Sequence, residues 1–254
     1  MYYVAIGDSF TEGVGDERPS GPARGWADRV AAGLAAALDE PVRYANLAIR
    51  GRLLAPIVTD QLDAALDLDP KPTLLSLNGG GNDMMRPGTD LGELIGLTAQ
   101  AVRRCADAGV PLLLLSGADP SQRLPFGRII HRRGEQLTAG VKALLAEYDV
   151  TFVDAFHDES LRQPHYWSPD RLHLAADGHA RVARLVLSAL GHPAGDEAAR
   201  PAPAAAGRRL GPELRYYREH VAPWVHRRLR GRSSGDDREP KYPTWIPVGP
   251  GFLG

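Results

Sequence analysis

The sequence predicts an α/β fold with a five-stranded parallel sheet covered by helices on both faces. Short apolar runs alternate with longer amphipathic stretches as far as about residue 193. Each of five such runs is followed by a helical pattern, which is typical of parallel strands joined by crossover helices. The chain has 254 residues, 43% of them hydrophobic, enough for one large domain with a substantial core.

The expected strands are short and bounded by turn residues. They cover residues 2–6, 42–46, 73–77, 111–115 and 151–155. The fourth run, Pro111 followed by four leucines, is too short for a helix and is typical of a strand buried on both faces. Helical patterns lie near residues 24–38, 55–67, 90–108, 128–147 and 176–190, and Gly109 and Gly191 follow two of them where a left-handed residue ends a helix.

The composition changes after the last of these helices. Residues 193–207 are rich in Pro, Ala and Gly and are typical of a linker. Residues 195–254 hold 11 Lys/Arg and 7 Asp/Glu, a net charge of +4, whereas residues 1–194 hold 19 and 24, a net charge of −5. We therefore divide the chain into a catalytic domain, 1–193, and a tail, 194–254, that joins the linker to a basic amphipathic segment.

The tail has one strong pattern. Apolar residues recur at helical spacing between Leu210 and Leu229, with arginines between them and an interruption at Pro223. We expect this helix to dock its apolar stripe on the acidic domain; the alternatives are peripheral contact with a membrane surface or with a partner protein. Residues 238–254 are punctuated by Pro and Gly, and we expect them to be extended or disordered.

Several function classes are disfavoured. The net charge of −1 gives no indication of nucleic-acid binding, and Cys105 is a single cysteine, which excludes an intrachain disulfide framework and fits a reducing compartment. Neither a signal peptide nor an apolar run of about 18 residues occurs, so we expect a cytoplasmic location. No cofactor or metal is expected, because His157, Asp158, Glu159 and His165 match no ligand spacing.

The first candidate site follows the first strand. Gly7-Asp8-Ser9 comes directly after residues 2–6, where a serine on a tight turn would expose its hydroxyl and offer its own N–H to an anion. Ser9 would serve equally well as the N-cap of the next helix. The residues of this segment leave these two readings open.

Asp170 and His173 favour the first reading. A serine is a poor nucleophile until a base removes its proton, and the base needs a partner that fixes its tautomer. The three-residue spacing of Asp170 and His173 lets one serve the other or lets both face one cleft. His179, on the following helix, is expected to be a packing or capping residue.

Hydrolysis of an acyl bond also needs donors for the oxyanion of the tetrahedral intermediate. Asn82 ends the glycine run 79–81 after the third strand, and Gly51 follows the second strand with a backbone N–H that no Cβ shields. A plain turn is the alternative for the glycine run. The loops that carry Ser9, Gly51 and Asn82 follow successive parallel strands, so right-handed crossovers place them at one sheet edge.

These segments, Gly7-Asp8-Ser9, Gly51, Gly80-Gly81-Asn82-Asp83 and Asp170-x-x-His173, together resemble the SGNH hydrolase family, also called GDSL-type esterases and lipases, over about residues 1–193. The resemblance implies a flavodoxin-like three-layer α/β/α sandwich. It also implies a serine esterase with Ser9 as nucleophile, His173 as general base and acid, and Asp170 as its orienting carboxylate. The oxyanion hole would consist of the Ser9 and Gly51 N–H groups and the Asn82 side chain.

The resemblance does not identify the substrate beyond a small-molecule ester. Deacetylases, carboxylesterases, lysophospholipases and thioesterases are not separated by these residues, and acyl transfer uses the same ones. Two other classes stay open: a binding module that holds an anion in its glycine loops, and a scaffold that acts through its basic tail. Phe10 stands where the family name has leucine, which keeps the position apolar.

Overall fold

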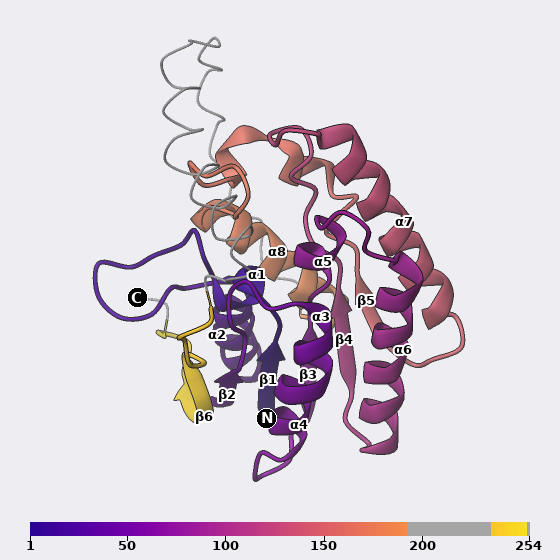
Figure 1. Ribbon diagram of the computed structural model, residues 1–254. Helices are drawn as coiled ribbons and strands as arrows, with labels where there is room; N and C mark the ends of the chain where they lie inside the picture. The colour runs from indigo at the N-terminus through magenta and orange to yellow at the C-terminus, as the bar shows by residue number, and fades with distance from the viewer. Residues whose placement is uncertain (193–234, 253–254) are drawn as a thin grey trace.

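The computed structural model describes residues 1–192 and 235–252 and has a central sheet between two layers of helices (Figure 1). The sheet order is β5-β4-β3-β1-β2-β6. Five strands pair in parallel: β1 (Tyr2–Ile6), β2 (Val42–Asn46), β3 (Leu74–Leu77), β4 (Leu112–Leu115) and β5 (Thr151–Val153). Their order, 2-1-3-4-5, is that of flavodoxin-like folds, so the predicted fold class is confirmed.

Helices cover both faces of the sheet. One layer holds α2 (Trp26–Leu38) and α8 (Ala176–Ala189), which pack against each other. The other holds α6 (Leu91–Asp107) and α7 (Gly127–Leu145), side by side in Figure 1, and a segment formed by α3 (Leu54–Pro56), the π-helical turn η1 (Ile57–Gln61) and α4 (Leu62–Leu66). The short elements are α1 (Ser9–Glu12), α5 (Gly81–Met84), and the 3-10 turns η2 (Glu159–Arg162) and η3 (Pro164–Tyr166).

The core lies on both faces of the sheet because successive side chains of a strand point to opposite sides. In β1, Tyr3 and Ala5 join the cluster under α2 and α8, whereas Val4 and Ile6 join the cluster under α4 and α6. All four side chains are fully buried. This two-sided burial holds the carboxyl end of β1, and therefore the loop that follows it, in a fixed place.

The sheet has a sixth strand that the prediction of a five-stranded sheet missed. β6 (Tyr242–Val248) pairs antiparallel with β2 at the sheet edge. Its prolines, Pro243 and Pro247, fit an edge strand because an edge leaves half of the backbone N–H groups without a ladder partner. Part of the segment that we expected to be extended or disordered is therefore built into the sheet.

Other expectations for the tail fall on residues that the structure does not describe. The predicted linker, 193–207, and the predicted basic helix between Leu210 and Leu229 lie outside the described residues. The division of the chain at residue 194 stays a prediction. Within the described ranges, no helix has the length and apolar character needed to cross a membrane.

Candidate active site

Ser9 lies at the carboxyl end of β1, on a turn that its neighbours determine. Gly7 has φ +154°, and a Cβ there would lie 2.6 Å from the Asn78 carbonyl oxygen, so this position requires glycine. The Asp8 carboxylate accepts a hydrogen bond from the Phe10 N–H at 3.0 Å and caps α1. Asp8, not Ser9, is thus the N-cap, and the alternative reading of Ser9 as a helix cap is wrong.

The Ser9 side chain contacts His173, and His173 contacts Asp170. The distance from Ser9 Oγ to His173 Nε2 is 3.0 Å, and that from His173 Nδ1 to Asp170 Oδ2 is 2.5 Å. In the neutral tautomer with its proton on Nδ1, His173 donates to Asp170 and accepts from the Ser9 hydroxyl. The structure thus brings together three residues, of which Ser9 and His173 are 164 positions apart in the sequence.

A tight turn places Asp170 and His173 side by side. The Ser168 N–H donates to the His173 carbonyl at 2.9 Å, and Arg171 lies in the left-handed region with φ +62°. A bridge between Trp167 and Leu174 closes the base of the turn. As a result, residues three apart in sequence point into the same cleft.

Asp170 is surrounded by donors that stabilise its charged form. Burial alone would raise its pKa, but hydrogen bonds from the His173 ring, the His173 N–H and the Ser168 hydroxyl hold the pKa of this carboxyl well below its usual range. Asp170 is therefore an ionised acceptor at neutral pH, which is the state that orients and stabilises a protonated imidazole.

Asn82 lies beside Ser9 at the start of α5 and lines the same pocket. Its side-chain nitrogen donates to Asp8 Oδ2 and to the Arg52 carbonyl, both at 3.1 Å. These two acceptors fix the amide plane at the rim of the pocket. Both N–H bonds of the Asn82 amide thus already have acceptors in the protein. To stabilise an oxyanion, one of these N–H bonds would have to be shared with it or turned towards it.

The Gly51 loop is fixed by an ion pair that the sequence analysis missed. The Arg50 N–H and guanidinium donate to the Glu12 carboxylate at distances of 2.6 to 3.0 Å. Gly51 follows with φ +77°, and no acceptor within the described part of the chain takes up its N–H. Glu12 ends α1, so this ion pair ties the helix that begins at Ser9 to the loop that carries Gly51.

Two further buried side chains hold the site together. Gln61, the last residue of the π-helical turn, donates to the Gly7 carbonyl at 3.0 Å and accepts from the Gly7 N–H at 2.8 Å. Asp83 accepts from the Leu54 N–H at 3.0 Å. Asp83 belongs to the segment Gly80-Gly81-Asn82-Asp83, so the sequence offered a signal for it. No local pattern in the sequence indicated Gln61.

The remaining histidines of interest have structural partners. His179 is fully buried, accepts a hydrogen bond from the Trp26 N–H and donates to the Val14 carbonyl, and burial lowers its pKa to about 4. It accepts the N–H of the first residue of α2, which agrees with the expected packing or capping role. His157 contacts Asp154 and Glu135 at the surface. Among the described residues, no cluster of His, Cys, Asp or Glu has the arrangement of a metal site.

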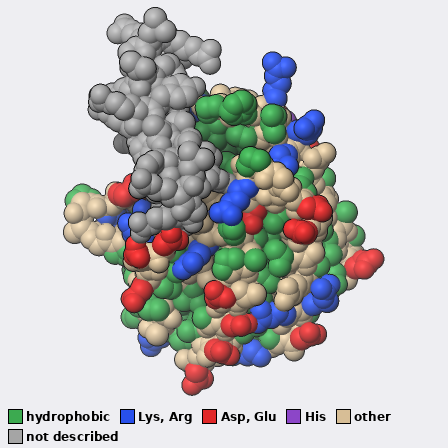
Figure 2. Space-filling model, viewed as in Figure 1, with side chains coloured by type: hydrophobic (Ala, Val, Ile, Leu, Met, Phe, Trp, Pro, Cys, Tyr) green, Lys and Arg blue, Asp and Glu red, His purple; other side chains and the backbone are tan. Residues whose placement is uncertain are grey.

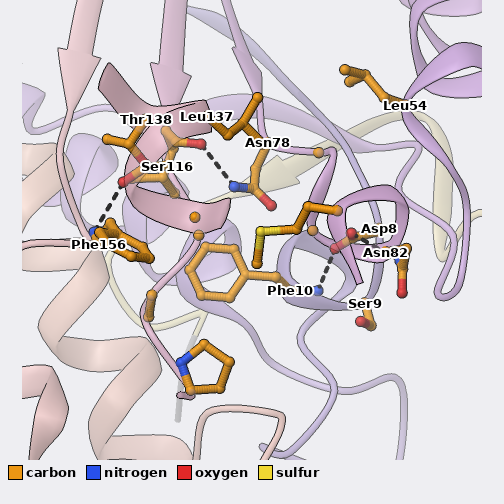
Figure 3. Close-up of a pocket in the computed structure, with 18 of the residues that line it drawn as sticks. Asp8, Ser9, Phe10, Leu54, Asn78, Asn82, Ser116, Leu137, Thr138 and Phe156 are labelled. Atoms are coloured by element: carbon orange, nitrogen blue, oxygen red, sulfur yellow. Dashed lines mark hydrogen bonds between the residues drawn. The ribbon is translucent and has the colours of Figure 1, made fainter. Parts of the chain in front are cut away.

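A cavity of about 150 Å³ opens beside the Ser9 side chain. Figure 3 shows Asp8, Ser9 and Asn82 on one side of it, Ser116, Thr138 and Phe156 on the other, and the Phe10 ring between them. The site lies at the carboxyl ends of β1 and β3, where the strand order reverses and open α/β sheets bind ligands.

The fold is that of known ester-hydrolase structures. The lipase Lip_vut3 from a goat rumen metagenome is 18% identical, with 76% of this chain and 98% of that chain covered and a TM-score of 0.63. TesA is 24% identical, with 75% and 98% covered and a TM-score of 0.61. A variant of Axe2, an acetyl xylan esterase from Geobacillus stearothermophilus, is 24% identical, with 77% and 97% covered and a TM-score of 0.59.

These identities are low and show the fold alone. A search of curated proteins gave no match. The sequence itself matches the GDSL-like Lipase/Acylhydrolase family over residues 5–181, which is more than half of the chain and includes all four candidate segments. The resemblance seen in the sequence is thereby confirmed: this chain belongs to the GDSL-like lipase/acylhydrolase family and is an ester hydrolase of the GDSL/SGNH type.

Proposed function

We propose that the protein hydrolyses a small-molecule carboxylic ester through an acyl-enzyme on Ser9. His173 takes the proton of the Ser9 hydroxyl as Ser9 Oγ attacks the ester carbonyl carbon. The C=O double bond opens to an oxyanion. As the carbonyl re-forms, the bond to the alcohol oxygen breaks, and that oxygen leaves with the proton from His173.

The second step repeats the first with water as the nucleophile. His173 deprotonates a water molecule, which attacks the acyl-enzyme carbonyl, and the proton returns to Ser9 as the acid leaves. Asp170 keeps the His173 proton on Nδ1 and stabilises the imidazolium that forms in both steps. The Ser9 N–H, the Gly51 N–H and the Asn82 amide would receive the oxyanion.

The observation that carries this proposal is the unbroken contact from Ser9 through His173 to Asp170, at 3.0 and 2.5 Å. A binding module that holds an anion in its glycine loops needs neither the histidine nor its carboxylate partner in contact with the serine. The ionised state of Asp170 and the position of the site at the switch point of the sheet support the same assignment.

The test is whole-protein mass spectrometry after treatment with a fluorophosphonate, which reacts with activated serines. We expect one adduct on the wild type and none on Ser9→Ala, which should abolish hydrolysis and change the unfolding free energy by less than about 1 kcal/mol. Ser168→Ala is a matched control, because Ser168 lies in the same site but donates only to Asp170. An unlabelled, folded wild type would contradict the proposal and favour the binding module.

A further inference from the structure

The cavity beside Ser9 extends away from the catalytic residues into the apolar interior. From Ser9 and His173 it passes Met84 and Met85 and reaches α7 and the ends of β4 and β5. Its inner wall consists mainly of apolar side chains: Leu77, Leu114, Leu115, Leu137, Val141, Phe152 and Phe156. Leu77, Leu114, Leu115 and Phe156 are buried core residues, so the inner part is an interior pocket, not a surface groove.

The charge of the lining is confined to one end. Of the described residues around the cavity, only Asp8 and His173 are ionisable, and both lie beside Ser9. Polar side chains farther in are engaged with the protein: Asn78 donates to the Leu115 carbonyl at 2.7 Å, and Thr98 to the Leu94 carbonyl at 2.9 Å. The Ser116 hydroxyl accepts from the Phe156 N–H at 3.0 Å.

This lining disfavours a sugar or an anionic group at the inner end, because each would lose hydrogen bonds to water and find few partners. An apolar group gains from the same environment. The volume of about 150 Å³ sets the size, since an apolar interior cavity of this volume holds roughly a benzene-sized ligand of six carbons.

We infer that this cavity binds the acyl chain of the substrate and that the preferred acyl group is unbranched and apolar, with about six carbons. The inference rests on the proposed function, because it places the acyl carbonyl at Ser9. The acyl group must stay bound while the alcohol departs and water enters. A pocket that is closed and apolar at its inner end suits the part that stays, and the open rim near His173 suits the part that exchanges.

The first experiment measures kcat/KM for p-nitrophenyl esters of acetate, butanoate, hexanoate, octanoate and dodecanoate. Burial of each methylene should raise kcat/KM about fourfold. Hexanoate should therefore exceed acetate by roughly two hundred-fold, and dodecanoate should fall below hexanoate because the chain no longer fits. A parallel series of acetate esters with longer alcohols should show no such rise.

Variants of α7 test the position of the chain. Val141→Phe adds volume at the inner end of the cavity and should move the highest kcat/KM from hexanoate to butanoate. Ala139→Phe is the matched control, because Ala139 is exposed on the same helix and does not line the cavity. Leu137→Ala removes volume and should move the optimum to octanoate, which keeps the test decisive if Val141→Phe does not fold.

Fluorophosphonate labelling of Ser9, measured for each variant, distinguishes a failure of the acyl-chain assignment from a failure of the serine esterase proposal. A labelled enzyme whose kcat/KM is highest for acetate, or flat from acetate to octanoate, overturns the acyl-chain assignment and leaves the esterase proposal standing. A rise along the alcohol series in place of the acyl series overturns it too, since the leaving group then occupies the cavity. A folded wild type that is not labelled overturns both.

Discussion

At the scale of single residues, Asp8 connects the turn that carries Ser9, the proposed nucleophile, to the proposed oxyanion amide of Asn82. One carboxylate oxygen accepts from the Phe10 N–H and caps α1, and the other accepts from the Asn82 side chain. Burial raises the pKa of Asp8 to about 6, although the Phe10 N–H and His173 act in the opposite direction. The buried charge of Asp8 therefore lowers the stability of the protein, but it also orients two groups of the site, the Phe10 N–H and the Asn82 amide.

Asp8 should make stability depend on pH in mildly acidic solution. Between pH 3.8, its ordinary pKa, and about pH 6, the native carboxyl keeps a proton that the unfolded carboxyl has lost. The Asp8 contribution to the unfolding free energy should therefore decrease as pH rises through this window, by about 3 kcal/mol in total. Urea unfolding at pH values from 4 to 8 measures this change in the unfolding free energy.

Asp8→Asn is the matching variant for this pH dependence. It cannot ionise, so the Asp8 contribution to the slope should vanish and the variant should gain stability relative to the wild type as pH rises. Asparagine replaces one of the two acceptor oxygens by an NH2 donor, so the contact with the Phe10 N–H or that with the Asn82 amide is lost and kcat should fall. Identical pH slopes in the two proteins would contradict the assignment of the shift to Asp8.

Removal of the Asn82 amide tests the oxyanion assignment. Asn82→Ala should lower kcat by about a hundred-fold or more, because one donor to the developing charge is lost. Ser9 should still react with a fluorophosphonate, since its contact with His173 does not involve Asn82. A kcat within threefold of the wild type would show that the amide stays on Asp8 and Arg52 during the reaction.

The sequence indicated the residues whose local context is distinctive, and missed those whose role depends on distant contacts. Ser9 follows a strand directly, and Asp170 and His173 share one turn, so short patterns were enough. Gln61 binds the Gly7 backbone across 54 positions, and Arg50 binds Glu12 across 38. Nothing in the neighbourhood of Gln61 or Arg50 in the sequence distinguishes it from an ordinary polar residue on a surface.

At the scale of elements, the start of strand β6 is joined to α1 and α2 by one lysine. The Lys241 ammonium donates to the Glu12 carbonyl at 2.6 Å, to the Ala23 carbonyl at 2.9 Å and to the Asp28 carboxylate at 2.6 Å. Asp28 in turn accepts from the Gly25 N–H at the start of α2. Lys241 thus fixes the end of α1, the start of α2 and the start of β6 relative to one another.

Lys241→Met should destabilise the protein by about 3–5 kcal/mol, because it leaves the Asp28 charge buried without its partner. The side chains of Lys241 and Asp28 are only 7% and 3% exposed. Lys142→Met is the control: its pair with Asp154 is 51% exposed on the lysine side and should contribute less than about 1 kcal/mol. Urea unfolding of both variants measures the two costs.

Addition of Asp28→Asn to Lys241→Met should restore part of the lost stability, since the unpaired charge is removed while a side-chain oxygen can still accept from the Gly25 N–H. Equal costs for Lys241→Met and Lys142→Met would show that the buried pair has no special role.

Of the strands that the sequence predicted correctly, β1 and β4 are apolar throughout and β3 is interrupted only by Ser76, as two-sided burial in a parallel sheet requires. β6 lacks that pattern. It lies at the edge, contains Pro243 and Pro247, and begins about 50 residues after the end of α8. Its pairing with β2 depends on the three-dimensional position of an exposed edge, which no local pattern reveals.

At the scale of the whole molecule, the chain assembles its site from residues far apart in the sequence, at the switch point of the sheet. Ser9 and His173, separated by 164 positions, meet at the carboxyl ends of the sheet. Figure 2 shows acidic and basic side chains interspersed on the described part of the visible face. The family match ends at residue 181. Residues beyond it nevertheless contact the loops that carry the proposed site.

The described C-terminal segment, residues 235–252, contacts the loops around the site. Gly235 lies so close to the loop of Gly51 that a Cβ on it would be 2.1 Å from the Arg50 carbonyl oxygen. β6 covers the outer edge of β2, the strand that leads into this loop, and Lys241 holds the end of α1. We therefore expect the C-terminal segment to support catalysis through the position of the loops, although none of its described residues lines the cavity.

Two shortened chains test this expectation. A chain that ends at Ser234 loses β6 and Lys241, exposes the β2 edge and leaves Asp28 unpaired, so its melting temperature should fall by about 10 °C or more, with hydrolysis reduced in parallel. A chain that ends at Val248 keeps these contacts and should match the full-length protein in both properties. Thermal unfolding and kcat/KM for one p-nitrophenyl ester distinguish the cases. If the chain ending at Ser234 keeps its melting temperature and activity, the site does not depend on β6 or Lys241.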